Sequence, residues 1–152
     1  MTGRLHAAIG GIRPPGVYRW LSRAHVEPVR RELGAAGWSL YPLDGRGIVT
    51  ARAFFDGCAR ALAFPAWFGH NWDALADCLS DLSWLPGTGH VLLWDQYGVL
   101  ARHDPKAWRL AYQVCAAAIG TRVQTGTVPL YVLLRGAGPV EVPDTLEVIP
   151  PL

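Results

Sequence analysis

The chain has 152 residues, 51% of them hydrophobic and seven of them Trp, with a formal net charge of +2. This composition excludes a disordered chain and provides enough apolar residues for one domain with a buried core. No apolar run approaches the ~20 residues that a membrane-spanning helix needs.

In residues 1–43, Gly and Pro residues separate short segments that are predicted to be helices or strands. Residues 1–16 are rich in Gly and Pro, which predicts a flexible lead-in, and residues 17–20 form a candidate edge strand. Residues 27–36 have a proline in the first turn and are followed by Gly37, as is typical of a helix. Residues 38–43 are predicted to be a strand.

Three further helices are indicated by their N-caps and inner faces. Thr50 caps a helix with the inner face Phe54, Cys58 and Leu62, and Asn71 caps a helix that runs to about Leu82. Asp104-Pro105 is a cap followed by proline at the first helical position. The inner face of this last helix consists of Trp108, Tyr112, Cys115 and Ile119.

Two nearly continuous apolar segments, 90–94 and 128–134, are typical of strands that are covered on both faces of a parallel sheet. Strands that alternate with helices predict an α/β fold with right-handed crossovers. We therefore expect a single domain over residues 17–135, followed by a proline-rich, extended or loosely docked tail over 136–152.

Cys58, Cys78 and Cys115 are odd in number, scattered and without a C-x-x-C pair, so we expect buried free thiols in a reducing compartment. The N-terminal residues lack the long apolar core of a signal peptide. The sequence thus predicts a cytoplasmic protein.

The charge is unevenly distributed, because residues 61–101 contain four aspartates and no Lys or Arg. Asp73, Asp77 and Asp81 are spaced four residues apart and form one stripe along the predicted helix. Like charges at this spacing repel one another, and Asp81 also lies near the negative helix C-terminus. A carboxylate stripe without cations, beside aromatic residues, favours a surface that binds a cationic partner.

The segment Phe-Pro-Ala-Trp-Phe-Gly-His-Asn-Trp-Asp-Ala-Leu-Ala-Asp-Cys-Leu, residues 64–79, resembles the signature of the barstar family of intracellular ribonuclease inhibitors. The resemblance continues through Leu43-Asp44-Gly45 and residues 90–94 and covers about residues 38–134. It implies a small three-stranded parallel sheet packed with helices, here with an N-terminal strand and helix extension. It also implies a protein that is not an enzyme and needs no cofactor.

The resemblance implies a role for specific side chains. In the family, the carboxylate that matches Asp77 enters the phosphate-binding pocket of the ribonuclease and pairs with its Arg and Lys side chains. The partner would be a basic microbial ribonuclease, barnase-like or a related guanine-preferring enzyme, bound one to one. The implied partner-binding residues are Trp67, Asn71, Trp72, Asp73, Ala76, Asp77 and Asp81.

Several positions differ from the best-known family member. Ala76 takes an aromatic position, Trp72 takes the position of a smaller Leu, and Asp81 takes that of a small residue. The family's distal acidic interface residue has no clear match, since Arg122 and Gln124 lie in that region. These differences bear on which ribonuclease is bound.

Two other functions fit part of the sequence. His70, Asp73 and Asp77 lie at i, i+3 and i+7 and present three ligands for a divalent ion, as a metal-binding protein or metal-dependent hydrolase would require. An RNA-binding protein would instead use the Arg-rich N-terminal half for phosphate contacts. The arginines concerned are Arg19, Arg23, Arg30 and Arg31.

Overall fold

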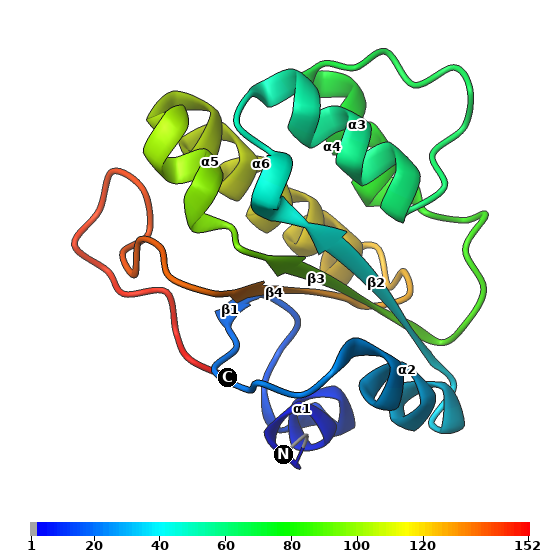
Figure 1. Cartoon of the computed structure of the whole chain (residues 1–152). Helices are drawn as coiled ribbons and strands as arrows, with labels where there is room; N and C mark the ends of the chain where they lie inside the picture. Colours follow the sequence, from blue (N-terminus) through cyan, green and yellow to red (C-terminus); the bar gives the residue numbers. More distant parts are fainter. Residues whose placement is uncertain (1–2) are drawn as a thin grey trace.

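The structure is a computed structural model and describes residues 3–152. Four parallel strands form one sheet between two layers of helices (Figure 1). The strands are β1 (Val17–Arg19), β2 (Trp38–Asp44), β3 (Gly89–Asp95) and β4 (Leu130–Arg135). The α-helices are α1 (Gly3–Ala7), α2 (Val26–Ala35), α3 (Ala51–Ala61), α4 (Trp72–Asp81), α5 (Gly98–His103) and α6 (Pro105–Gln124). Short helical turns at Ala8–Ile12 and Gly45–Gly47 complete the elements.

The sheet has four strands in the order β1-β4-β3-β2, so the expectation of three strands was wrong. The additional strand is β1, which pairs in parallel with β4 from Val17 opposite Val132 to Arg19 opposite Leu134. Without β1, the backbone groups on the outer side of β4 would have no partner. The segment predicted as an edge strand therefore belongs to the same sheet as the other three.

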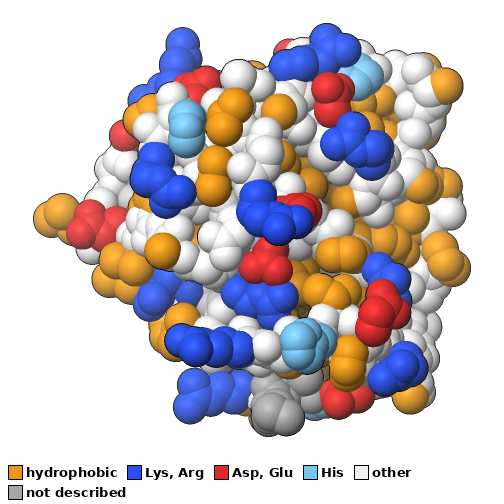
Figure 2. Space-filling model, viewed as in Figure 1, with side chains coloured by type: hydrophobic (Ala, Val, Ile, Leu, Met, Phe, Trp, Pro, Cys, Tyr) orange, Lys and Arg blue, Asp and Glu red, His pale blue; other side chains and the backbone are white. Residues whose placement is uncertain are grey.

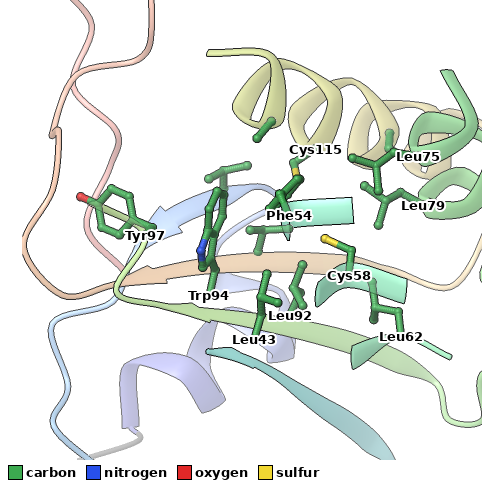
Figure 3. Close-up of a cluster of buried hydrophobic side chains, with 14 of the residues drawn as sticks. Leu43, Phe54, Cys58, Leu62, Leu75, Leu79, Leu92, Trp94, Tyr97 and Cys115 are labelled. Atoms are coloured by element: carbon green, nitrogen blue, oxygen red, sulfur yellow. The ribbon is translucent and has the colours of Figure 1, made fainter. Parts of the chain in front are cut away.

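The two faces of the sheet carry separate hydrophobic cores, because side chains alternate along each strand. Leu92 and Trp94 of β3 point toward the layer formed by α3, α4, α5 and α6. There they belong to the same core as Phe54 and Cys58 of α3 (Figure 3). Val91 and Leu93 point to the opposite face, which α1 and α2 cover (Figure 1). Burial on both faces explains why β3 reads as an uninterrupted apolar segment.

The predicted N-caps are confirmed. Thr50 Oγ1 accepts a hydrogen bond from the Ala53 N–H at 3.1 Å, and Asp104 Oδ1 accepts one from Ala107 at the same distance. Pro105 is the first residue of α6. No sequence pattern indicated α5, because its six residues are too few to show a helical period.

The three cysteines are buried and free, as predicted. Burial raises the pKa of the Cys115 thiol to about 12 and raises that of Cys58 well above its usual value. Both thiols are therefore protonated and unreactive at neutral pH.

Both terminal segments pack against the domain. Leu5 of α1 is fully buried, and Tyr131 Oη donates to the carbonyl of Ala8 at 2.9 Å, within residues predicted to form a flexible lead-in. In the proline-rich tail, Ile149 is fully buried and the Leu152 N–H donates to the Arg19 carbonyl at 2.9 Å. Apolar side chains at both ends thus bury themselves against the sheet layers, while the division into lead-in, domain and tail stays a prediction.

None of the helices in residues 3–152 has both the length and the apolar character needed to cross a membrane. The cytoplasmic location stays a prediction.

Candidate partner-binding site

Helix α4 begins where the sequence predicts. Asn71 Oδ1 accepts a hydrogen bond from the Ala74 N–H at 2.8 Å, while its amide nitrogen donates to the Gly69 carbonyl at 3.3 Å. The side chain therefore satisfies one free N–H of the first turn and holds the preceding loop against the helix. Asn71 is exposed, but its amide oxygen and nitrogen both form hydrogen bonds within the chain. Its side chain therefore also positions the loop and helix that form the site.

The inner face of α4 anchors it to the core. Leu75, Cys78 and Leu79 are fully buried, and burying each leucine contributes roughly 1.5–3 kcal/mol. Trp72 is half-buried, with its ring 4.7 Å from that of Phe55. Ala76 is also half-buried, so these two residues border the exposed face rather than form it.

Asp73, Asp77 and Asp81 are all exposed, as their spacing predicts. Within residues 3–152 no Lys, Arg or His side chain forms an ion pair with any of the three. Burial raises the pKa of the Cys78 thiol on the same helix, and the charges of Asp77 and Asp81 raise it further. The outer face of α4 is therefore acidic, and none of its three carboxylates forms an ion pair with a side chain in residues 3–152.

The loop before α4 presents one aromatic side chain to solvent and buries another. Trp67 is 66% exposed, whereas the adjacent Phe68 is 5% exposed and packs on Phe64 at a ring distance of 4.9 Å. A tryptophan held open next to a carboxylate face resembles the aromatic anchors of protein interfaces.

His70 connects this loop to α3. Its Nε2 lies 3.2 Å from Asp56 Oδ1, its Nδ1 lies 3.1 Å from the Phe68 carbonyl oxygen, and its backbone is left-handed at φ = 50°. No sequence pattern indicated Asp56 as part of the site, because Asp56 lies on α3 and not on α4 or its loop. The pair fixes the direction in which the chain enters α4.

This pairing also bears on the metal-site hypothesis. His70 is directed to Asp56 of α3 rather than to Asp73 and Asp77. Throughout residues 3–152, no three His, Cys, Asp or Glu side chains are grouped so that they could hold a metal ion. The three residues proposed as ligands are therefore not brought together.

The C-terminus of α4 is held by Arg122 of α6, which is 1% exposed. Its Nη1 donates to the carbonyls of Leu79, Ser80 and Asp81 at 3.3, 3.2 and 2.9 Å, and its Nε donates to the Val128 carbonyl at 3.0 Å. A cation at a helix C-terminus satisfies free carbonyls and complements the helix dipole. Arg122 is thus a structural support of α4, which no local sequence pattern indicated.

The arginines of the RNA-binding hypothesis are spread over different elements. Arg19 lies in β1, where its Nε donates to the Ile149 carbonyl at 2.9 Å, while Arg30 and Arg31 lie on α2. Arg30 pairs with Glu27 at 3.0 Å. Two of the four arginines therefore have partners within the chain.

A family model, described as Barstar (barnase inhibitor), matches residues 38–135. This span is more than half of the chain, begins at β2 and ends with β4. The chain belongs to the barstar family. No curated protein matches the chain.

The barstar match includes α4 and the loop before it, so the acidic face and Trp67 lie inside the family domain. It excludes α1, β1 and α2 and the tail from residue 136. The barstar family is one of inhibitors rather than enzymes and implies a ribonuclease partner in general. Outside the match, β1 completes the sheet, and α1 and α2 cover its second face.

Proposed function

We propose that this protein inhibits a basic bacterial ribonuclease by inserting the acidic face of α4 and the loop with Trp67 into the enzyme's active site. The observation that carries the proposal is the exposure of Asp73, Asp77 and Asp81 with no cation paired to any of them in residues 3–152. Barstar membership supports the same conclusion. Acting in the cytoplasm, the inhibitor would protect the cell before the ribonuclease is exported.

The geometry of α4 fits such a role chemically. A ribonuclease binds RNA phosphates with Arg and Lys, and carboxylates on a rigid helix provide the same charge and hydrogen-bond acceptors. Trp67 would supply an aromatic anchor beside them. Because Asn71 and the His70–Asp56 pair already order the loop, little conformational entropy would be lost on binding.

The experiment is a binding and inhibition assay against a panel of guanine-preferring bacterial ribonucleases. We expect a one-to-one complex, of the size class that buries about 1,600 Å² in total, and loss of RNA cleavage. If no ribonuclease of the panel is bound at micromolar protein, the proposed activity is wrong.

Substitutions of the three aspartates test the site itself. Asp77→Ala should weaken binding most, by ~2–5 kcal/mol, because partner cations would be left desolvated and unpaired. Asp73→Ala should cost less. Asp81→Ala should cost least, since Asp81 lies furthest from Trp67 along the helix. Its carboxylate also interacts electrostatically with Arg122 of the same chain.

Glu141→Ala is the matched control, because it removes the same charge from an exposed position in the tail. It should leave ribonuclease binding unchanged. Melting temperatures of Asp77→Ala and Asp81→Ala should stay unchanged or rise slightly, because each substitution relieves like-charge repulsion. An Asp77→Ala variant that unfolds, or binds as tightly as the parent, would contradict the assignment of α4 as the contact surface.

A further inference from the structure

A pocket lies at the carboxyl ends of β1, β3 and β4 and shares no residue with the acidic face of α4. The chain leaves β1 toward α2, on one face of the sheet. It leaves the neighbouring β4 toward a tail that packs Ile149 and Val142 on the opposite face. Adjacent parallel strands whose connections diverge in this way open a crevice, which is where ligands bind in open α/β sheets.

The crevice is a pocket of about 530 Å³, within the range of small-molecule sites. Its walls come from the segment after β1, the ends of β3 and β4, and residues 136–140 of the tail. Gly138 allows the tail to pass close to Tyr97, since a Cβ there would lie 2.6 Å from the ring. Tyr97 Oη donates to the Pro139 carbonyl at 2.7 Å and fixes this wall.

Three arginines and one aspartate line the pocket. Arg135 is neutralised by Asp95, with contacts of 2.8 and 3.1 Å, and its Nη1 donates to the Ala24 carbonyl at 2.8 Å. Its guanidinium also lies 5.4 Å from the Trp20 ring centroid. Arg135 is therefore a fixed part of the wall and contributes no uncompensated charge.

The other two arginines remain uncompensated. Arg19 uses only its Nε, for the Ile149 carbonyl, and Arg23 is exposed without an ion pair or hydrogen bond to any residue in 3–152. Figure 2 shows Lys and Arg side chains scattered over the viewed face of the molecule, with acidic side chains beside some of them. Two guanidinium groups without a carboxylate partner in residues 3–152 match the charge of a phosphate monoester, which is ≈ −1.5 to −2 at pH 7.

The rim of the pocket adds an apolar contribution. Leu21 is 68% exposed and Val140 is 45% exposed, and both line the pocket beside Trp20. Exposed aliphatic side chains next to Arg19 and Arg23 provide contacts for the organic part of a phosphorylated ligand.

From this arrangement we infer that the pocket binds a small organic phosphate monoester, with Arg19 and Arg23 holding the phosphate and Leu21 and Val140 contacting the rest of the molecule. Arg19, Arg23 and residues 136–140 lie outside the barstar match. The site would therefore be a property that the terminal segments add to the family domain, independent of ribonuclease inhibition.

The test is titration calorimetry at low ionic strength in a phosphate-free buffer, with adenosine 5′-monophosphate and phenyl phosphate as probes. Both should bind one to one, and adenosine should not bind. Arg23→Gln should weaken both probes about tenfold or more, as expected for the loss of a charged hydrogen bond. Leu21→Glu should also weaken them, because it places a negative charge at the rim.

Arg31→Gln is the matched control, since Arg31 is exposed on α2 and does not line the pocket. It should leave both affinities unchanged, while amide resonances of Gly136 and Gly138 should shift on titration in the parent. Absence of binding at millimolar probe, or an equal loss in Arg31→Gln, would overturn the inference. Tighter binding of a 5′-hydroxyl RNA oligonucleotide with equal sensitivity to Arg31→Gln would overturn it in favour of a general RNA surface.

Discussion

Replacing Arg122 with alanine should destabilise the protein more than any surface substitution, because this side chain joins three separate segments. Its guanidinium is buried and donates to carbonyls of Leu79, Ser80 and Asp81 at the end of α4, and to that of Val128 before β4. Burial lowers the pKa of Arg122, while the charge of Asp81 raises it.

The expected loss follows from these contacts. A hydrogen bond to a charged group contributes ≈ 1.5–3 kcal/mol, and a buried acceptor left without a partner costs ≈ 1–3 kcal/mol. The variant no longer has to desolvate a guanidinium, which offsets part of the sum. We therefore expect a decrease of about 3–5 kcal/mol in the free energy of unfolding, or roughly 6–20 °C in melting temperature.

Urea denaturation followed by circular dichroism measures this loss. Arg109→Ala on the same helix is the control, because Arg109 is partly exposed and lies 3.7 Å from Asp144, so its removal should cost at most about 1 kcal/mol. Arg122→Lys should recover only part of the stability, since an ammonium lacks the planar fork that reaches two segments. If Arg122→Ala is no more destabilising than Arg109→Ala, the carbonyls of α4 do not depend on the guanidinium.

Three further predictions concern charge, pH and capping. The association rate with a ribonuclease should fall steeply as the Debye length shortens from about 30 Å at 0.01 M salt to about 8 Å at 0.15 M, while the dissociation rate should change less. An association rate that does not depend on salt in stopped-flow measurements would contradict an interface dominated by charge. Burial, and secondarily the charge of Arg122, lowers the pKa of His90 to about 4. The free energy of unfolding should therefore include the full contribution of neutral His90 above pH 6.5. It should decrease by about 3 kcal/mol as the pH falls toward 4. The free energy of unfolding of His90→Phe should lack this part of the pH dependence. If it decreases between pH 6.5 and 4 as much as that of the parent, the role assigned to His90 is wrong. Asn71→Ala should cost about 1 kcal/mol through loss of the 2.8 Å cap, whereas Asn71→Ser should retain most of it in the same assay.

The helices that sequence analysis identified are those whose signals lie within a few residues of one another. Thr50, Asn71 and Asp104 each cap a backbone N–H three residues ahead, so the information needed to place α3, α4 and α6 is local. The outward direction of Asp73 and Asp77 follows in the same way, since leucines at helical spacing determine which face is buried.

The fourth strand, by contrast, could not be assigned to the sheet from local patterns. Val17 and Val132 pair across most of the length of the chain, and a three-residue strand carries too weak a pattern to show which edge it will join. The same holds for the tail: its prolines predict an extended or loosely docked segment, and no local pattern indicates that Ile149 is fully buried.

In the candidate site, too, some features follow from local sequence and others from tertiary contacts. The sequence determined the exposed acidic face and its barstar resemblance, because both depend on spacing within one helix and one loop. Only the tertiary structure placed Asp56 against His70 and Arg122 beneath the end of α4. In isolation Asp56 and Arg122 read as ordinary charged residues on helices. Their roles depend on contacts between elements that are distant along the chain, and such contacts form only when hydrophobic burial packs those elements together.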